Sequence, residues 1–95
     1  MKRVAVIIKE PSMQYEGLRT SLGLLLEDID VQMIVLDHEI EEMNEAYADN
    51  LSFLDEMGGN YYSNHIANVT QYGFQPIERQ DLPALLQECD IIIPF

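Results

Sequence analysis

Two histidines are the side chains of this sequence best suited to acid–base or metal chemistry. His38 and His65 each follow a strand-like segment, so both could face one crevice. Together with Asp37, Glu39 and Glu10, they could offer nitrogen and oxygen ligands to a metal ion. A zinc site needs three or four converging ligands, and the chain has neither a His-x-x-x-His nor a Cys-x-x-Cys spacing. Two surface loop histidines are the simpler interpretation, so we expect no metal ion and no cofactor.

A serine close to the second histidine raises the question of a hydrolase. Ser63 lies two residues before His65, but a nucleophile elbow needs Gly-x-Ser-x-Gly and the chain reads Tyr-Tyr-Ser-Asn-His. A serine that precedes a helix commonly caps its first turn. We therefore expect Ser63 to be an N-cap. We expect the chain to hold no catalytic residue and not to be an enzyme.

The single cysteine, Cys89, is the candidate for thiol chemistry. It lies between the last predicted helix and the last predicted strand, at the opposite edge of the sheet from the loops that follow the strands. A free cysteine usually acts as a small buried hydrophobic residue. The flanking acids Glu88 and Asp90 would raise the pKa of its thiol, whereas a reactive thiol needs an electropositive setting. A structural role is favoured, and a sulfur-carrier role is the alternative.

Polar side chains gather where the predicted strands end, and this edge is where open α/β sheets bind their ligands. Lys9 could pair with Glu10 or Glu39, or it could meet an anionic ligand. Ser12 precedes a helix whose free N–H groups favour an anion, although no Gly-rich loop indicates a nucleotide phosphate. The candidate ligand-binding residues are Lys9, Glu10, Ser12, Asp37, His38, Ser63, Asn64 and His65.

A sheet is needed to bring these residues together, and the hydrophobic pattern predicts one. Five strand-like segments cover residues 3–9, 31–36, 60–62, 74–77 and 90–95, with helix-period segments between them. The first and last are continuous apolar runs, which are typical of strands covered on both faces. Right-handed crossovers then give an α/β fold, a three-layer α/β/α sandwich with a mostly parallel five-stranded sheet. Because proline lacks a backbone donor, the fourth strand, which contains Pro76, should lie at an edge.

The first helix should begin at Met13, with Ser12 as its N-cap. Gly17 and Gly23 cost about 1 kcal/mol each within a helix, so they indicate close packing against the sheet or a neighbour. The side chains that helical spacing places on the buried stripe are Tyr15, Leu18, Leu22, Leu25 and Leu26.

The second helix should span residues 42–57 and end at Gly58-Gly59, because glycine accepts the left-handed conformation. A short third helix should close near Gly73, and Asp81 should cap the last helix. The side chains expected to face inward from these helices are Met43, Ala46, Tyr47, Leu51, Leu54, Met57, Ile66, Val69, Leu82, Leu85 and Leu86.

Length and charge limit what the chain can do. Ninety-five residues allow one domain, 1–95, and a chain this short gains stability from self-association. Seventeen acids against five bases give a net charge of −12, which repels nucleic acid and anionic membranes and attracts cations or basic proteins. No apolar run approaches the roughly 18 residues of a membrane span, and the run near the start is too short for a signal peptide. With one cysteine, we expect a cytoplasmic protein.

Three stretches resemble the DsrE/DsrF-like family of small sulfur-relay proteins, to which the TusB, TusC and TusD subunits belong. They are the helix YEGLRTSLGL after a strand and a short Pro-containing loop, the strand VQMIVL followed by an acid, and the closing LPALLQECDIIIPF. The resemblance covers nearly the whole chain in order and length. It implies a flavodoxin-type sandwich that assembles as a dimer, trimer or hexamer, or with related subunits.

The same resemblance bears on the chemistry. Active relay members of the family carry a persulfide on a cysteine in the loop after the third strand. The matching segment here is Tyr62-Ser63-Asn64-His65, whose nearest nucleophile is the Ser63 hydroxyl, which cannot carry a persulfide. The second strand also departs from the family pattern, since Asp37-His38-Glu39-Ile40 stands where an Asp-Gly-Val turn is expected.

Three functions follow as hypotheses. The first is a non-catalytic DsrE/DsrF-like oligomeric subunit that assists intracellular sulfur transfer, with the reactive cysteine on another chain. The second is a small-ligand or metal-binding protein that uses the carboxyl edge of the strands. The third is a sulfur carrier that acts through Cys89.

Overall fold

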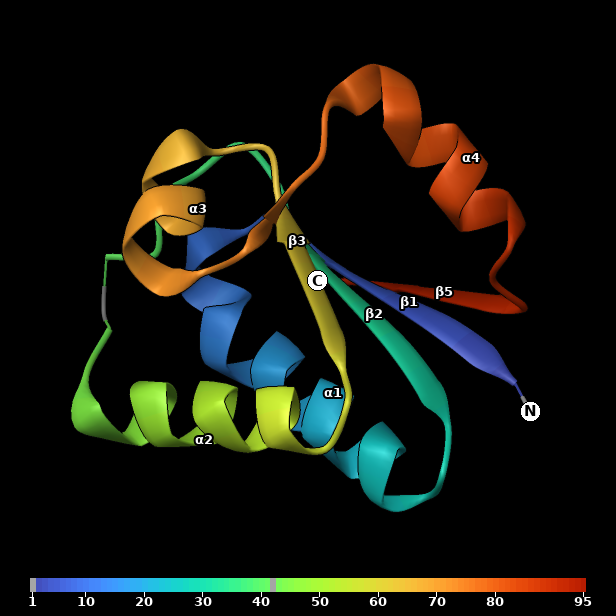
Figure 1. The fold of residues 1–95 in the computed structure, drawn as a ribbon, viewed down its shortest axis with the longest axis horizontal. Coiled ribbons are helices and arrows are strands. Elements are labelled where there is room, and N and C mark those ends of the chain that lie inside the picture. The colour runs from blue at the N-terminus through green and yellow to red at the C-terminus, as the bar shows by residue number, and fades with distance from the viewer. Residues whose placement is uncertain (1, 42) are drawn as a thin grey trace.

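A five-stranded parallel sheet lies at the centre of the molecule, with its strands in the order β4-β3-β2-β1-β5 (Figure 1). The computed structural model describes residues 2–41 and 43–95. The strands are β1 (Arg3–Ile8), β2 (Asp30–Val35), β3 (Asn60–Ser63), β4 (Gln75–Pro76) and β5 (Ile91–Pro94). The helices are α1 (Gln14–Leu26), α2 (Glu45–Glu56), α3 (Ile66–Tyr72) and α4 (Leu82–Gln87), with 3-10 turns at Pro11–Met13 and Arg79–Asp81.

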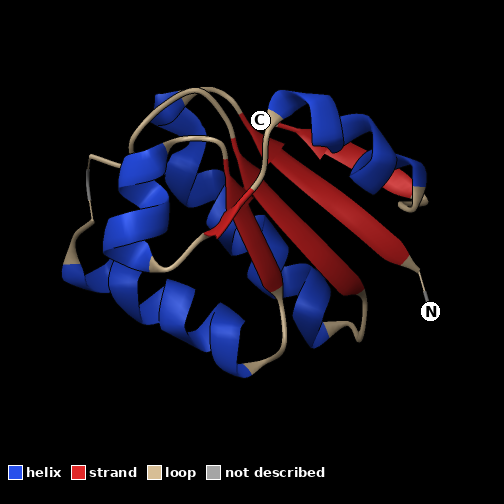
Figure 2. Cartoon of the chain, turned by 45° about the horizontal axis from the view of Figure 1, so that its top comes forward, coloured by secondary structure: helices blue, strands red, loops and turns tan. Residues whose placement is uncertain are grey.

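Helices cover both faces of this sheet, as Figure 2 shows. On one face, α1, α2 and α3 pack over a core that includes Val6 of β1 and Met33 of β2. On the other face, α4 packs over Ala5, Ile7 and Ile34. The predicted three-layer α/β/α sandwich is therefore confirmed.

The order of the strands explains why α4 lies apart from the other helices. The chain passes from β1 to β4 in one direction across the sheet, and α4 then leads back to β5 on the far side of β1. Right-handed connections that run in opposite directions place their helices on opposite faces. The start of α1 and the loop from β2 to α2 consequently share one face and one edge.

The central strands are buried, and the last strand is not. Val4–Ile8 of β1 and Val31–Val35 of β2 are buried on both faces. β5 pairs with β1 alone, and the side chains of Ile91 and Ile92 are 43% and 46% exposed. The prediction of a last strand covered on both faces is wrong, because β5 lies at the edge of the sheet. β4 forms the other edge, as Pro76 predicts.

The first helix begins one residue later than predicted, and Ser12 does not cap it. Pro11 opens a 3-10 turn in which the Met13 N–H donates to the Glu10 carbonyl oxygen over 2.9 Å. Ser12 lies inside this turn and is exposed, so its hydroxyl makes no capping bond to α1. The turn places Gln14 as the first residue of α1.

The predicted apolar stripe of α1 is correct only in its middle. Leu18 is fully buried, but Tyr15 and Leu26 are 42% and 66% exposed, because the buried face of the helix consists partly of small and polar residues. The close packing predicted at Gly17 is confirmed, since a Cβ there would lie 2.4 Å from Cδ1 of Ile8. The same prediction for Gly23 is wrong within this chain, because an added Cβ there would meet no atom of another element within 4 Å.

The second helix also begins later than predicted, and the expected start at residue 42 lies outside the described residues. Oδ1 of Asn44 accepts from the Tyr47 N–H over 2.8 Å and so caps α2. Tyr47, Leu51 and Leu54 form the buried face as predicted, whereas Ala46 and Met57 are exposed. The positive φ of +86° at Gly58 confirms the predicted helix end.

The last two helices are short, and two of their predicted features are wrong, the burial of Ile66 and the cap at Asp81. Ile66 is 70% exposed, because it lies on the outer side of α3, while Val69 contacts the core. Gly73 ends α3 with a φ of +75°, as predicted. Asp81 makes no side-chain cap for α4, because a 3-10 turn precedes the helix there.

Candidate functional site

A pocket of about 320 Å³ opens between the start of α1 and the loop from β2 to α2, beside the carboxyl ends of β1 and β2. Two of the eight predicted ligand-binding residues, Ser12 and His38, line it. The full set of lining residues is Pro11, Ser12, Gln14, Tyr15, His38, Glu39, Ile40, Glu41, Asn44 and Tyr47.

Three side chains of the pocket wall form one hydrogen-bonded row. The Tyr47 hydroxyl donates to Oε1 of Gln14 over 2.7 Å, and Nε2 of Gln14 lies 2.5 Å from Nε2 of His38. Nδ1 of His38 lies 2.8 Å from the carbonyl oxygen of Leu36. Because a carbonyl oxygen can only accept, Nδ1 carries a proton, and Nε2 of the neutral imidazole accepts from the Gln14 amide.

Burial fixes this row in place. Gln14 is 8% exposed and Tyr47 is 3% exposed, so their polar groups depend on each other for hydrogen bonds. Burial also raises the pKa of the Tyr47 hydroxyl, which therefore keeps its proton. With Nε2 of His38 occupied by Gln14, the row can orient a ligand, but it offers no free base for proton transfer.

The pocket is acidic and partly aromatic. Glu39 and Glu41 line it, and within residues 2–41 and 43–95 none of the lining residues is a lysine or an arginine. The rings of Tyr15 and Tyr47 lie with their centroids 6.5 Å apart and tilted by 37°. These groups can meet a positive charge or a flat apolar group, and they would repel an anion.

Lys9 and Glu10, two of the predicted site residues, lie near the carboxyl end of β1 but outside the pocket lining. Both are exposed, and both backbone N–H groups donate to the carbonyl oxygen of Phe95, over 2.8 and 3.3 Å. Among the described residues, Lys9 forms no ion pair with Glu10 or Glu39. The structure therefore does not bring Lys9 into the site.

Asp37, Asn64 and Arg79 form a contact that we call the loop clasp. The Asp37 N–H donates to Oδ1 of Asn64 over 2.7 Å, and Nδ2 of Asn64 donates back to Oδ1 of Asp37 over 2.8 Å. Arg79 forms an ion pair with Asp37. Asp37 has a left-handed backbone with a φ of +67°, which aspartate tolerates better than most residues. The loop clasp joins the loops after β2 and β3 to the segment before α4, so Asp37 and Asn64 have structural roles.

Ser63 is a buried structural residue. Its hydroxyl oxygen accepts from Nδ2 of Asn68 over 3.0 Å and from the His65 N–H over 3.1 Å. Asn68 is fully buried, donates to the His38 carbonyl oxygen and accepts from the Ile40 N–H, each over 3.0 Å. These bonds fix the loop that carries His38 to the pocket. The predicted N-cap role of Ser63 is wrong, because β3 continues to this residue and α3 begins three residues later.

His65 is the residue that caps α3. Its Nδ1 accepts from the Ala67 N–H over 3.2 Å, and it does not line the pocket that contains His38. The two histidines are therefore not brought into one site. In the described part of the chain, no group of three or more His, Cys, Asp or Glu side chains is placed to hold a metal ion.

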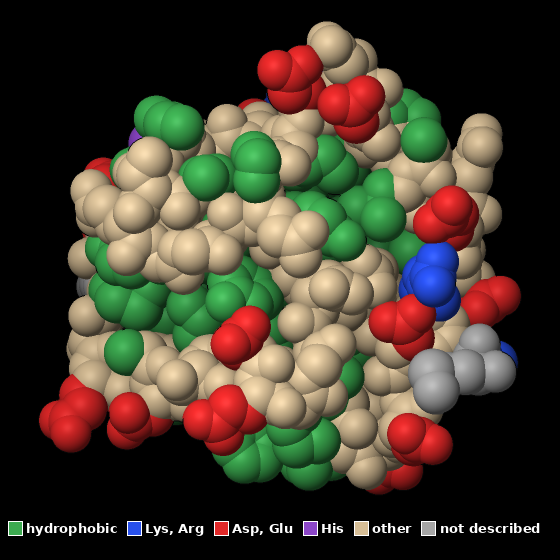
Figure 3. All heavy atoms as spheres, in the orientation of Figure 1, with side chains coloured by type: hydrophobic (Ala, Val, Ile, Leu, Met, Phe, Trp, Pro, Cys, Tyr) green, Lys and Arg blue, Asp and Glu red, His purple; other side chains and the backbone are tan. Residues whose placement is uncertain are grey.

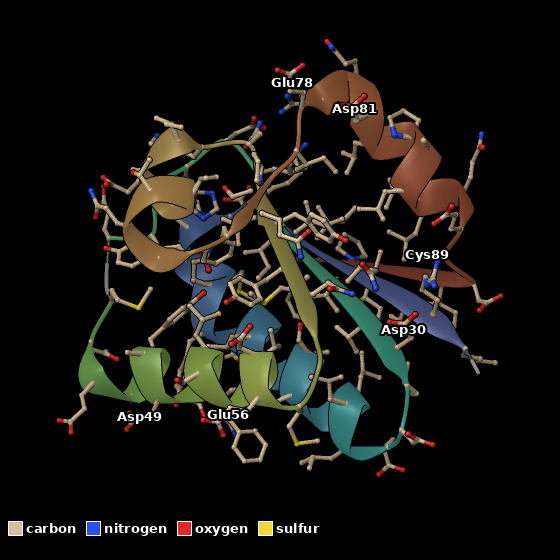
Figure 4. All side chains as sticks on the ribbon, viewed as in Figure 1. Asp30, Asp49, Glu56, Glu78, Asp81 and Cys89 are labelled. Carbon is tan, nitrogen blue, oxygen red and sulfur yellow. The ribbon has the colours of Figure 1, made fainter. Side chains whose placement is uncertain are left out.

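Cys89 lies close to Asp30 at the amino edge of the sheet, as Figure 4 shows, and it is not among the residues that line the pocket. Its Sγ donates to the Leu85 carbonyl oxygen over 3.5 Å. Burial raises the pKa of the thiol, and the nearby Arg3 lowers it. Asp30 and Glu88 raise it again, so the environment disfavours a thiolate.

The residues that sequence reasoning missed are those whose role depends on long-range packing. A glutamine at the start of a helix is ordinarily solvated, so nothing in the sequence marks Gln14 as buried. Tyr47 is predicted to face the core, and it does, but the spacing does not show that its hydroxyl reaches α1. Glu41 and Asn44 belong to a loop that the sequence assigns partly to the helix.

Fold and site together define an α/β sandwich with a pocket of small-molecule size at the carboxyl edge of a parallel sheet. Comparisons with protein-family models, with curated proteins and with solved structures found no match for this chain. No helix among the described residues has both the length and the apolar content that a membrane crossing requires.

Proposed function

We propose that this protein binds a small molecule in the pocket between the start of α1 and the loop from β2 to α2. The observation that carries the proposal is the hydrogen-bonded row of buried Tyr47, buried Gln14 and half-buried His38 in the wall of a pocket of about 320 Å³. Ligand sites in proteins are typically concave, about 300–1,000 Å³ in volume and largely preformed, with a few fixed polar groups.

The surrounding structure supports a preformed site. The row is fixed at its far end by the bond from His38 to the Leu36 carbonyl oxygen. The loop that carries His38 is fixed by Asn68, which is fully buried and donates a hydrogen bond to the His38 carbonyl oxygen. A site whose polar groups are already oriented loses little entropy when a ligand binds.

A fragment screen followed by amide NMR tests this proposal. We expect fragments that bind to shift the backbone amides of Tyr15, His38 and Tyr47. Ser12→Trp places an indole at the exposed rim of the pocket and should abolish the shifts. Ser52→Trp, on the exposed side of α2, is the matched control and should leave them unchanged. Fragment shifts that map to another face, or that survive Ser12→Trp, would overturn the proposal.

A second candidate function is the non-catalytic oligomeric subunit that the DsrE/DsrF-like resemblance implies. The observation that favours it is β5, an edge strand with Ile91 and Ile92 exposed, since exposed apolar edge strands tend to pair with other chains. Light scattering of the purified protein tests it. We expect an oligomer that Ile92→Lys converts to a monomer while the circular dichroism stays native, and a monomeric wild type would contradict this function.

Sulfur carriage by Cys89 is the remaining alternative, and its surroundings argue against it. The thiol is half-buried among the apolar residues under α4, and its pKa is raised. Intact-mass spectrometry after incubation with a persulfide donor tests it. We expect no gain of a sulfur atom in the folded protein, whereas a gain that Cys89→Ser abolishes would establish the carrier function.

A further inference from the structure

We infer that the ligand of this pocket is a small organic cation, an ammonium group joined to a flat apolar group. This inference rests on the proposed binding function and adds the chemical class of the ligand. It is carried by three features of the lining: its charge, its aromatic rings and the direction of its hydrogen bonds.

The charge of the lining is negative. Glu39 and Glu41 both line the pocket, and no lysine or arginine lies among the lining residues that the structure describes. A carboxylate within about 4 Å attracts a cation by roughly 1 to 4 kcal/mol, depending on how much water remains between them. The net charge of −12 adds long-range attraction for cations and repulsion for anions.

The aromatic rings suit a cation with an apolar body. Tyr15 is 42% exposed and lines the pocket, with its ring centroid 6.5 Å from that of Tyr47. The guanidinium carbon of Arg19 lies 5.8 Å from the Tyr15 ring centroid, so a ligand cation would share this ring with Arg19, whose charge offsets part of the attraction. Attraction between a cation and an aromatic face is worth about 0.5 to 2 kcal/mol.

The hydrogen bonds of the wall leave acceptors for the ligand. The Tyr47 hydroxyl donates its hydrogen bond to Oε1 of Gln14, and the Gln14 amide donates to His38. In the described part of the chain, the Tyr47 oxygen and Oε1 of Gln14 each make one hydrogen bond, so each keeps a lone pair. An ammonium group has three donors and no acceptor, and it therefore complements this wall and the two carboxylates.

Three probes with the same phenylethyl group and different charge test the inference. They are 2-phenylethylammonium, 3-phenylpropanoate and 2-phenylethanol, each titrated into the protein at low salt and followed by amide NMR. We expect the ammonium compound to shift the amides of Tyr15 and Tyr47 and to bind at least about tenfold more tightly than the other two, a difference of about 1.4 kcal/mol.

Two double variants of equal net charge distinguish attraction by the carboxylates of the pocket from attraction by the net charge of the whole protein. Glu39→Gln with Glu41→Gln removes the carboxylates that line the pocket. Glu56→Gln with Glu78→Gln removes two exposed carboxylates that lie elsewhere, on α2 and before α4, as Figure 4 shows. We expect the first pair to weaken ammonium binding about tenfold and the second to change it less than about twofold. Dispersed amide spectra for both double variants would confirm that they fold.

Each other outcome overturns the inference in a recognisable way. Binding of phenylethanol or phenylpropanoate in the pocket, equal to or tighter than the ammonium compound, would refute the cation class and leave the pocket as a site. Equal losses in the two double variants would show that only the overall charge attracts the cation. Absence of pocket shifts with all three probes would remove the inference, and the fragment screen would then decide whether the pocket binds anything.

Discussion

At the scale of single residues, Tyr47 serves the core and the pocket at once. Its ring belongs to the apolar core of the face covered by α1 and α2, and its hydroxyl donates to Gln14. Burial raises the pKa of this hydroxyl above the ordinary value of 10.0, because the phenolate would lose its water. The native state therefore holds a proton that the unfolded state releases in alkaline solution.

Tyr47→Phe should make the stability less sensitive to alkaline pH. A raised native pKa contributes stability that is complete below the unfolded value of 10.0 and is lost as the pH rises above it. One such proton contributes a slope of at most about 1.4 kcal/mol per pH unit. Urea unfolding followed by circular dichroism between about pH 9 and 11.5 gives the slopes of both proteins.

The comparison uses slopes because the phenylalanine variant would also lack the bond to Gln14, which lowers stability at every pH. Tyr61, Tyr62 and Cys89 also have raised pKa values, so the variant should keep part of the alkaline decline. Parallel curves for the two proteins would show that Tyr47 ionises normally in the native state.

The sequence predicted the edge of the sheet that carries the pocket, but only part of its lining. His38 follows a strand, and strand ends can be predicted from apolar runs, so its place was predictable. Gln14 begins α1 directly after the 3-10 turn at Pro11–Met13, and Tyr47 bonds to it from 33 positions further along the chain. Such distant pairings depend on packing that one sequence does not reveal.

At the scale of elements, the contact of α1 with β1 depends on one glycine. A Cβ at Gly17 would lie 2.4 Å from Cδ1 and 2.5 Å from Cγ1 of Ile8, which is fully buried. We expect Gly17→Ala to lower the free energy of unfolding by about 1 to 3 kcal/mol, because the helix must move or Ile8 must change rotamer. Urea denaturation measures the change.

The second glycine of the same helix provides the control. Gly23 has no atom within 4 Å of an added Cβ, so Gly23→Ala should raise the free energy of unfolding by about 0.5 to 1 kcal/mol through helix propensity alone. The opposite signs at two positions of one helix are the critical result. Similar effects at both positions would mean that α1 does not pack closely on β1.

The carboxyl ends of α1 and α2 have the same hydrogen-bond pattern but a different residue in the left-handed conformation. After α1 the Ile29 N–H bonds to the Leu24 carbonyl oxygen, and after α2 the Gly59 N–H bonds to that of Leu54. The residue in the left-handed conformation is Asp28 in the first case, with a φ of +62°, and Gly58 in the second. Glycine avoids the steric cost that aspartate bears there.

Asp28→Gly should therefore stabilise the protein by about 1 kcal/mol. Part of the gain would come from removing a negative charge at the negative end of a helix. Asp28→Asn removes the charge and keeps a side chain, so thermal unfolding of the two variants separates the contributions. If Asp28→Gly gained nothing beyond Asp28→Asn, backbone conformation would not limit stability at this helix end.

Element types were easier to predict than element ends. The apolar runs of β1 and β2 are unambiguous because both strands are buried on both faces, and the Gly58-Gly59 pair marks a helix end by its own chemistry. The predicted caps at Ser12 and Asp81 are wrong because both residues fall within 3-10 turns. The sequence does not distinguish a serine or aspartate in such a turn from one that caps an α-helix. The apolar sequence of β5 is typical of a central strand, but β5 lies at an edge of the sheet. Its position could not be predicted because it depends on the path of the whole chain.

At the scale of the whole molecule, most of the negative charges have no positive partner. The three ion pairs recorded among the described residues are Arg3 with Asp30, Arg3 with Glu88, and Arg79 with Asp37. Figure 3 shows acidic side chains spread over one face, with basic ones gathered mainly at one place. With 17 acids and 5 bases, most carboxylates repel one another, and this repulsion favours expansion of the chain.

Salt should consequently stabilise this protein. The screening length falls from about 30 Å at 0.01 M salt to about 3 Å at 1 M, so repulsion across a small domain is largely removed. Several repulsions of a few tenths of a kcal/mol each should together raise the free energy of unfolding by on the order of 1 kcal/mol. Urea unfolding at increasing NaCl measures this, since guanidinium would itself screen the charges.

A charge-reduced variant shows whether the stabilisation comes from screening. Asp49, Glu56, Glu78 and Asp81 are exposed and lie in two separate places in Figure 4, the first two on α2 and the last two just before α4. Their conversion to amides changes the net charge from −12 to −8. We expect the stability of this variant to depend less on NaCl, because less repulsion remains to be screened. An unchanged dependence would mean that salt acts through burial of apolar surface instead, and sodium sulfate would then stabilise both proteins equally.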